Sequence, residues 1–234
     1  DIEDDSELRR GKPPLHKLFG IDIAINSGNF LYFLPLLVFI KNRNRIKPET
    51  LLRAYEIYAQ EMINIHIGQA MDIWWHKGVT EDIDEKRYMQ MCAYKTGTLA
   101  RMSARLAVAL CEGSGEMEER IGRMAESIGV AFQIQDDILD IVSEDRKKFG
   151  KSYGNDIKEG KRTLMVIYTL NNAEERDRKR LLEILSMHTD ERELVDEAID
   201  IMRKYGAIEH AKSVARRIAE DSWKDAESLF KPSP

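Results

Sequence analysis

The sequence contains few cysteines and no cysteine motif. Its 234 residues include only Cys92 and Cys111, and neither belongs to a C-x-x-C pair. A disulfide framework and a zinc site are therefore not expected, and this cysteine usage favours a reducing compartment, which we take to be the cytoplasm. The five histidines show no H-E-x-x-H spacing, which argues further against a zinc hydrolase.

Two further absences limit the expected partners. The net charge is −5, without a basic bias, so nucleic acid is not an expected partner. The longest apolar run, FLYFLPLLVFI at residues 30–40, is shorter than the roughly 20 residues that span a bilayer. We predict a buried helix there and no transmembrane segment. No signal or transit peptide is visible, and because the first residue is Asp1 and not Met, we expect the chain to begin inside a longer protein.

Strand signals are scarce, and no G-x-x-x-x-G-K-[ST], G-x-S-x-G or strand-borne G-x-G-x-x-G motif occurs. The i, i+3, i+4 apolar spacing of helices is abundant instead. It covers residues 51–67, 88–110, 121–142, 163–170, 181–187, 194–205 and 208–230. With 43% hydrophobic residues and no linker-like tract, the sequence predicts an all-α fold. We expect one domain over residues 1–234, a bundle of about ten helices.

Three carboxylates interrupt an apolar stretch in the predicted helix 121–142. Asp136 and Asp140 are four residues apart and Asp137 and Asp140 are three apart, so they are neighbours on the helix surface. Like charges so placed repel, and burial raises the cost. Mg²⁺ would remove the repulsion, because it takes one or two carboxylates and completes its shell with water and substrate phosphates. A solvated acidic helix end is the alternative.

The start of the chain repeats this order of charges. Two acids, a basic cluster and a Gly-Lys pair follow one another in both segments: Asp1, Asp4, Arg9, Arg10 and Gly11-Lys12 in the first, and Asp137, Asp140, residues 146–148 and Gly150-Lys151 in the second. We interpret the two segments as facing sites in which acids hold metal and bases hold phosphate, to which arginine binds in bidentate fashion. A charged surface helix is the alternative.

Two other features point to an anion. The loop 144–162 contains seven Lys or Arg residues and three glycines, which predicts a lid over phosphates, with an ordinary solvated loop as the alternative. Lys95-Thr96 lies within an apolar helical stretch, where a lysine either extends its amine to solvent or meets an anion. Gln69 and Asp72 are weaker candidates.

With these residues in hand, the chain resembles the trans-isoprenyl diphosphate synthases, most closely the geranylgeranyl diphosphate synthases. DIEDDSELRRG matches the family's D-D-x-x-D-x-x-x-x-R-R-G from its second Asp, and residues 132–140 match its F-Q-x-x-D-D-x-x-D. Lys95-Thr96, residues 68–72 and residues 150–156 match its K-T, G-Q-x-x-D and G-K-x-x-G-x-D motifs. The resemblance extends over essentially the whole chain.

The resemblance implies helices around a central cavity, a homodimer, and about three Mg²⁺ ions that bridge the two acid motifs and an allylic diphosphate. It implies metal ligands at Asp1, Asp4, Asp136 and Asp140, and catalytic roles for Asp1, Asp4, Asp136, Asp137 and Lys95. It implies substrate contacts from Arg9, Arg10, Lys95, Thr96, Phe132, Gln133, Lys151 and Lys161. Isopentenyl diphosphate would attack an allylic cation in a dry tunnel beside the metals.

The family's helices before the first acid motif, which carry a Lys and an Arg for isopentenyl diphosphate, have no counterpart in these residues, so we expect the N-terminal part to be missing. The expected function is a chain-elongating prenyltransferase that gives geranylgeranyl diphosphate. A non-catalytic partner subunit of a heteromeric prenyl synthase and a farnesyl or longer-chain synthase are alternatives. A terpene cyclase would need N-D-x-x-S/T-x-x-x-E, which residues 155–163 do not match, and an acidic structural protein would not need Lys95, Lys151 and Lys161.

Phe132 and Gln133 precede the acids on the same predicted helix. Phe132 and Asp136 are four residues apart, so we predict that the ring borders the allylic end of the substrate, where a π face stabilises positive charge. We predict that the Gln133 amide donates to a carboxylate or a diphosphate oxygen. Core packing of Phe132 and solvation of Gln133 are the alternatives.

Overall fold

The computed structural model describes residues 1–3, 6–77, 83–142 and 153–230, and most of these residues are helical. From the N-terminus, the helices are α1 (Leu15–Phe19), α2 (Ile21–Phe33), α3 (Leu36–Asn42), α4 (Pro48–His76), α5 (Glu85–Cys92), the π-helix η1 (Ala93–Gly97) and α6 (Thr98–Leu110). Then follow α7 (Gly115–Val142), α9 (Asn155–Lys158), α10 (Leu164–Asn172), α11 (Glu175–Ser186), α12 (Arg192–Lys204), α13 (Ala207–Ala226) and the short 3₁₀ helix η2 (Glu227–Leu229). The predicted all-α fold is confirmed.

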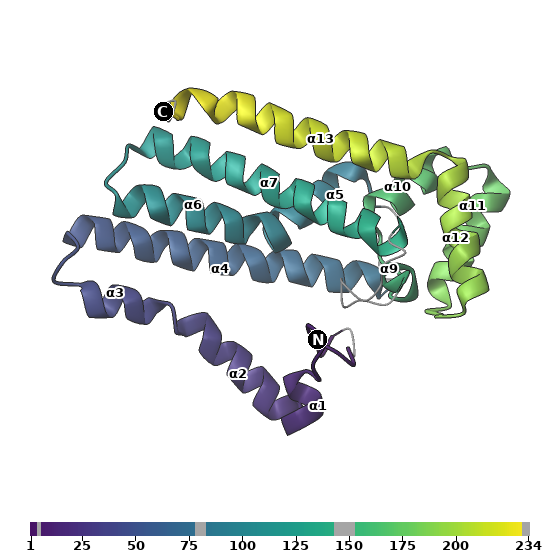
Figure 1. Cartoon of the computed structure of the whole chain (residues 1–234), viewed down its shortest axis with the longest axis horizontal. Coiled ribbons are helices and arrows are strands. Elements are labelled where there is room, and N and C mark those ends of the chain that lie inside the picture. The colour runs from purple at the N-terminus through teal and green to yellow at the C-terminus, as the bar shows by residue number, and fades with distance from the viewer. Residues whose placement is uncertain (4–5, 78–82, 143–152, 231–234) are drawn as a thin grey trace.

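The long helices stack in the order α4, α6, α7 and α13, and each packs against the next (Figure 1). Their facing surfaces carry the apolar periodicity seen in the sequence. The main core contains fully buried aliphatic side chains from α7, α10, α12 and α13, among them Ile134, Leu164, Ile199 and Ala211. The C-terminal ends of α4 and α7 lie at the same end of this stack, beside α9.

Local signals set several helix ends. Pro48 occupies the first turn of α4, where its missing N–H costs nothing. Asp84 caps α5 by accepting a hydrogen bond of 2.7 Å from the Arg87 N–H. The predicted helix 88–110 is divided by η1, and α7 begins at Gly115, six residues before the predicted start. Periodicity locates a helix but does not resolve a single π turn, because that turn adds only one residue.

The prediction of a buried helix over residues 30–40 was wrong. Pro35 separates α2 from α3, because a proline lacks the N–H that would continue the helix ladder. Most side chains of this run lie on the surface, including Phe33 at 68% and Val38 at 60% exposure, whereas Phe39 is buried. Phe39 packs with Ala54 and Tyr58 of α4 in a second, smaller core.

Residues Ile21–Asn42 are long and apolar enough to cross a membrane when judged by length and composition alone. An 18-residue window within this stretch has a mean hydropathy of 1.8, and 6% of that window is buried. Core helices of soluble proteins pass the same test, and Pro35 breaks this stretch into two helices. The absence of a transmembrane segment therefore stays a prediction.

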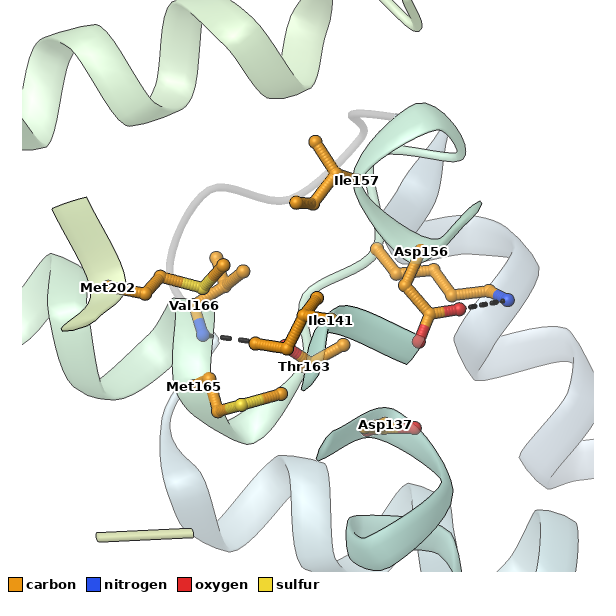
Figure 2. A pocket seen from close by; sticks show the side chains of 9 residues that line it. Asp137, Ile141, Asp156, Ile157, Thr163, Met165, Val166 and Met202 are labelled. Carbon is orange, nitrogen blue, oxygen red and sulfur yellow. Dashed lines mark hydrogen bonds and ion pairs between the residues drawn. The ribbon is translucent and has the colours of Figure 1, made fainter. Parts of the chain in front are cut away.

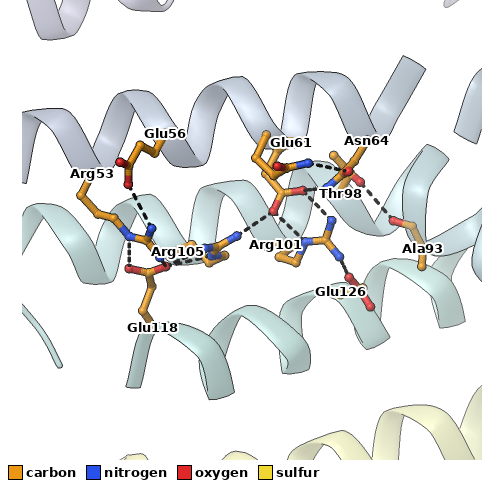
Figure 3. A network of polar contacts seen from close by, with 11 residues as sticks. Arg53, Glu56, Glu61, Asn64, Ala93, Thr98, Arg101, Arg105, Glu118 and Glu126 are labelled. Carbon is orange, nitrogen blue, oxygen red and sulfur yellow. Dashed lines mark hydrogen bonds and ion pairs between the residues drawn. The ribbon is translucent and has the colours of Figure 1, made fainter. Parts of the chain in front are cut away.

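A network of charged side chains joins α4, α6 and α7 (Figure 3). Glu61 of α4, only 1% exposed, accepts hydrogen bonds from Arg101 (2.8 Å to Nε) and from Arg105 (3.0 Å to Nη1). Glu118 of α7 accepts from Arg53 and from Arg105. Burial by itself raises the pKa of Glu61 and Glu118, but the arginine hydrogen bonds outweigh it and hold both pKa values below 4.5.

Candidate active site

The acids of α7 lie at the boundary between the core and the end of the helix stack. Asp137 and Asp140 are buried, at 6% and 8% exposure, and Asp136 is half-buried. Ile134 and Ile138 on the same helix are fully buried. The structure therefore excludes the alternative of a solvated acidic helix end.

Asp137 has a hydrogen-bond donor at each carboxylate oxygen. The Tyr88 hydroxyl donates to Oδ2 over 2.7 Å, and the Gln133 amide donates to Oδ1 over 2.8 Å. Burial, together with the negative charge of Asp156, raises the pKa of Asp137 to about 7, although the two hydrogen bonds act in the opposite direction. Burial also raises the pKa of Tyr88, so this hydroxyl remains a donor at neutral pH.

The Lys95-Thr96 pair is brought to these acids by η1. The Thr96 hydroxyl donates to the Gln133 side-chain oxygen over 2.7 Å, and Gln133 in turn donates to Asp137. Lys95 forms a short ion pair with Asp72 of α4. The prediction that Gln133 donates to a carboxylate is therefore confirmed. Its alternative, a solvated Gln133, is excluded because both ends of the amide are bonded.

The segment after α7 closes back on Asp140. The Asp156 N–H donates to Asp140 Oδ2 over 3.0 Å, and the Gly154 N–H donates to the Asp140 carbonyl over 3.1 Å. Gly154 has a φ of +67°, a conformation that favours glycine, and it begins the one-turn helix α9. Asp140 thus fixes the backbone of residues 154–156 against the end of α7.

Lys161 lies beside this segment and is bonded to acids. Its ammonium donates to Asp156 Oδ1 over 2.9 Å and pairs closely with Glu159. Burial alone would lower the pKa of Lys161, but the two carboxylates outweigh it and raise this pKa above its ordinary value. A small cavity of about 10 Å³ lies among Asp137, Asp156, Lys161 and apolar neighbours such as Met165 (Figure 2). That volume suits about one water molecule.

The arginine-rich start of the chain forms a tight turn. Arg9 and Lys12 exchange backbone hydrogen bonds of 2.6 and 3.2 Å, and Arg10 and Gly11 between them both have positive φ. This geometry is that of a type I′ turn, which explains why a glycine follows the two arginines. Arg9 pairs with Asp1 over 3.4 Å, and the side chains of Arg9 and Arg10 are exposed.

An ion pair places the N-terminal segment at the end of α4. Glu3 Oε1 lies 3.8 Å from Lys77 Nζ and 3.4 Å from Nε2 of His76, which is one helical turn beyond Asp72. Figure 1 shows the N-terminus at the end of the stack where α4 and α7 finish. The two predicted acid segments therefore lie at the same end of the molecule.

The remaining predicted residues divide into two groups. Asp4 and Lys151, and with Lys151 most of the basic part of the predicted lid, lie outside the described residues. Phe132 is 67% exposed, so its alternative role in core packing is excluded in this chain. Its predicted contact with a substrate stays a prediction.

Mg²⁺ fits the donor chemistry of this end of the molecule. Within the described parts of the chain, no group of three or more His, Cys, Asp or Glu side chains converges. Mg²⁺ needs only one or two carboxylates, since water and phosphate complete its octahedron. The half-buried carboxylate of Asp136 and that of Asp1 are ligands of the required type.

One residue of the site, Tyr88, was missed by the sequence reasoning, and the contacts of another, Asp156, were not foreseen. Tyr88 lies 49 residues before the acid that it contacts, and no spacing rule links the two positions. The hydroxyl of a tyrosine within an apolar helical stretch was the available signal, because such a group needs a partner when buried. Asp156 matched a motif, but its bonds to Asp140 and Lys161 could not be read from it.

The fold and this site define an all-α protein of the isoprenoid synthase type, with acids and bases from distant segments gathered at one end of a helix stack. The model of the polyprenyl synthetase family matches residues 1–202. The chain belongs to this family, as its sequence motifs predicted.

Relatives and solved structures agree with this assignment. The chain is 38% identical over 215 residues to a short chain isoprenyl diphosphate synthase of Methanothermobacter thermautotrophicus, covering 92% of this chain and 64% of the relative. It is 34% identical to a geranylgeranyl pyrophosphate synthase of Dictyostelium discoideum, covering 98% and 71%. The crystal structure of geranylgeranyl pyrophosphate synthetase from Pyrococcus horikoshii superposes with a TM-score of 0.86 at 33% identity, covering 99% and 69%. The chain thus spans less than two thirds of the length of the first of these relatives.

Proposed function

We propose that this chain is the major part of a prenyltransferase that condenses isopentenyl diphosphate with an allylic diphosphate and releases geranylgeranyl diphosphate. We propose further that residues 1–234 form one domain of an enzyme that acts in the cytoplasm. One observation carries the proposal. The hydrogen bonds from Thr96 through Gln133 to Asp137, beside the Lys95–Asp72 pair, gather the family's separate motifs into one site.

The side chains divide the proposed chemistry among them. Asp1, Asp4, Asp136 and Asp140 would hold Mg²⁺, which neutralises diphosphate charge when bound. Arg9 and Arg10, exposed on their tight turn, suit bidentate contacts to phosphate oxygens. Asp137 is less available as a ligand, because Tyr88 and Gln133 already donate to its oxygens. We propose that it orients Gln133 and, through it, Thr96.

The proposal is tested by binding and turnover measured separately. Calorimetry should detect farnesyl diphosphate binding that requires Mg²⁺, and Asp136→Ala should weaken it by at least about tenfold, equal to about 1.4 kcal/mol. Asp200→Ala, a surface acid on α12, is the matched control and should bind normally. Turnover is followed by sizing the products from isopentenyl diphosphate and each allylic diphosphate.

Products of geranylgeranyl length would support the synthase, and shorter or longer products would revise the chain length. Binding without turnover would favour the non-catalytic partner subunit. Binding that ignores both Mg²⁺ and Asp136 would reject the proposed site.

A further inference from the structure

Lys95 and Thr96 lie in a π-helix and not in a regular helix. Ala93–Gly97 adopts this wider winding between two α-helices, α5 and α6. The Thr98 hydroxyl, fully buried, donates to the Ala93 carbonyl over 3.2 Å and so satisfies an acceptor of the widened turn. A single π turn rotates the side chains that follow it and occurs often at functional sites.

Two glycines from neighbouring helices press on the backbone of this π-helix. A methyl group on Gly68 of α4 would lie 2.3 Å from Lys95 N, and one on Gly129 of α7 would lie 2.7 Å from Gly97 Cα. Both obstructing atoms belong to the main chain, which cannot turn aside as a side chain can. Since η1 and α6 lie between α4 and α7, the two glycines allow both neighbours to approach η1 closely.

Each glycine precedes by four residues the side chain that binds the π-helix. Gly68 precedes Asp72, which pairs with Lys95. Gly129 precedes Gln133, which accepts the hydrogen bond from Thr96. Residues four apart lie on one face of a helix, so each glycine contact sets the distance of the polar contact one turn further on.

We propose that Gly68 and Gly129 are positioning residues of the site. They hold the π turn so that Lys95 reaches Asp72 while Thr96 reaches Gln133. A side chain at either glycine pushes α4 or α7 away from η1 and breaks the polar contact that follows it. The inference rests on the proposed function only in treating Lys95 and Thr96 as diphosphate-binding residues.

The test compares Gly68→Ala and Gly129→Ala with Gly115→Ala. Gly115 is the control, because it lies on α7 as well, but a methyl group there has no atom within 4 Å. The first measurement is the rate at which an acetylating reagent modifies Lys95, followed by mass spectrometry, and it needs no substrate. We expect Gly68→Ala to raise this rate about fivefold, as loss of an ion pair worth about 1 kcal/mol allows, and Gly115→Ala to leave it unchanged.

The second measurement is the affinity for pyrophosphate in the presence of Mg²⁺, by calorimetry. We expect both Gly68→Ala and Gly129→Ala to weaken it about tenfold, with circular dichroism unchanged. A wild-type chain that binds no pyrophosphate would reject the proposed function, while the Lys95 labelling would still decide the role of Gly68. Unchanged labelling in Gly68→Ala and unchanged affinity in both variants would overturn the inference. Unfolding of both variants beside a folded Gly115→Ala would also overturn it, in favour of a role in folding.

Discussion

At the scale of single residues, Tyr88 and Asp137 show how a buried carboxylate is accommodated next to a hydrophobic core. Tyr88 is 1% exposed and Asp137 is 6% exposed, so water cannot replace a lost hydrogen bond at either. A hydrogen bond to a charged group contributes about 1.5–3 kcal/mol to stability. The Tyr88 hydroxyl therefore stabilises the fold and fixes the orientation of Asp137 at once.

Tyr88→Phe should lower the free energy of unfolding by about 1.5–3 kcal/mol, because it keeps the ring and removes one donor from a buried carboxylate. Urea unfolding measures the loss at a pH well above the raised pKa of Asp137, where this carboxyl is charged. Tyr153→Phe is the control. Its hydroxyl donates over 2.8 Å to Asp196, whose side chain is 44% exposed and can be hydrated again. Equal losses in the two variants would contradict the role given to Tyr88.

At the scale of elements, the charge network between α4, α6 and α7 fixes how these helices pack. Two glutamates and two arginines lie between these helices, at positions where apolar side chains would normally meet. They are Glu61, Glu118, Arg101 and Arg105, and their side chains are largely buried. Such a network adds less stability than an apolar core, but removing one member leaves its partners unpaired. The network therefore selects one packing register, because the apolar faces of these helices would by themselves allow several registers.

Glu61→Ala should destabilise the protein by about 3–5 kcal/mol, because Arg101 and Arg105 would lose a buried partner. Arg123→Ala breaks only exposed pairs, with Glu119 and Asp225, and should cost less than about 1 kcal/mol. Urea denaturation compares the two. A loss in Glu61→Ala no larger than in the control would show that the network is not coupled to the helix packing.

The same network predicts a pH dependence with a defined sign. The pKa values of Glu61 and Glu118 are lower in the folded chain than the ordinary value of 4.5, so the unfolded chain binds more protons below that pH. Their contribution to stability is complete above pH 4.5 and is lost as the pH falls through the folded pKa values.

The difference in unfolding free energy between wild type and Glu61→Gln isolates this contribution from that of other groups. It should shrink as the pH is lowered from 6 towards 3. A difference that stays constant over that range would argue against the lowered pKa of Glu61.

At the scale of the whole molecule, an extensive apolar surface faces outward on α1, α2 and α3. Its large hydrophobic side chains, each at least 38% exposed, include Leu18, Phe19, Ile21, Ile23, Phe30, Leu31, Phe33, Leu37, Val38 and Ile40. Contiguous surfaces of this kind mark interfaces in soluble proteins. We propose that a second copy of the chain covers it, in a homodimer.

Phe33→Glu and Val38→Glu should shift the chain from dimer to monomer, since each places a charge on the proposed interface without disturbing a buried side chain. Sedimentation equilibrium measures the shift. Met187→Glu changes an equally apolar, 46% exposed residue at the end of α11 and should not alter the association. A monomeric wild type, or equal effects from all three variants, would contradict the proposal.

The sequence by itself determined the helices and the family, because both depend on short-range patterns. An apolar repeat of three and four residues specifies a helix whatever it packs against, and the acid, K-T and F-Q motifs keep their spacing in any fold. The spacing of Asp136, Asp137 and Asp140 on one helix, and the bond from Gln133 to Asp137, followed directly from helix geometry.

Only the tertiary structure decided how those motifs meet. The contacts of Tyr88 with Asp137 and of Lys95 with Asp72 join residues 49 and 23 positions apart, and they depend on how closely α5 packs against α7 and η1 against α4. The exposure of residues 30–40 could not be predicted from the sequence either. An apolar run indicates that its side chains will be covered, but it does not tell whether the core of the same chain or another molecule covers them. Helix formation is local, whereas the burial of a charge depends on neighbours that the chain supplies from far away.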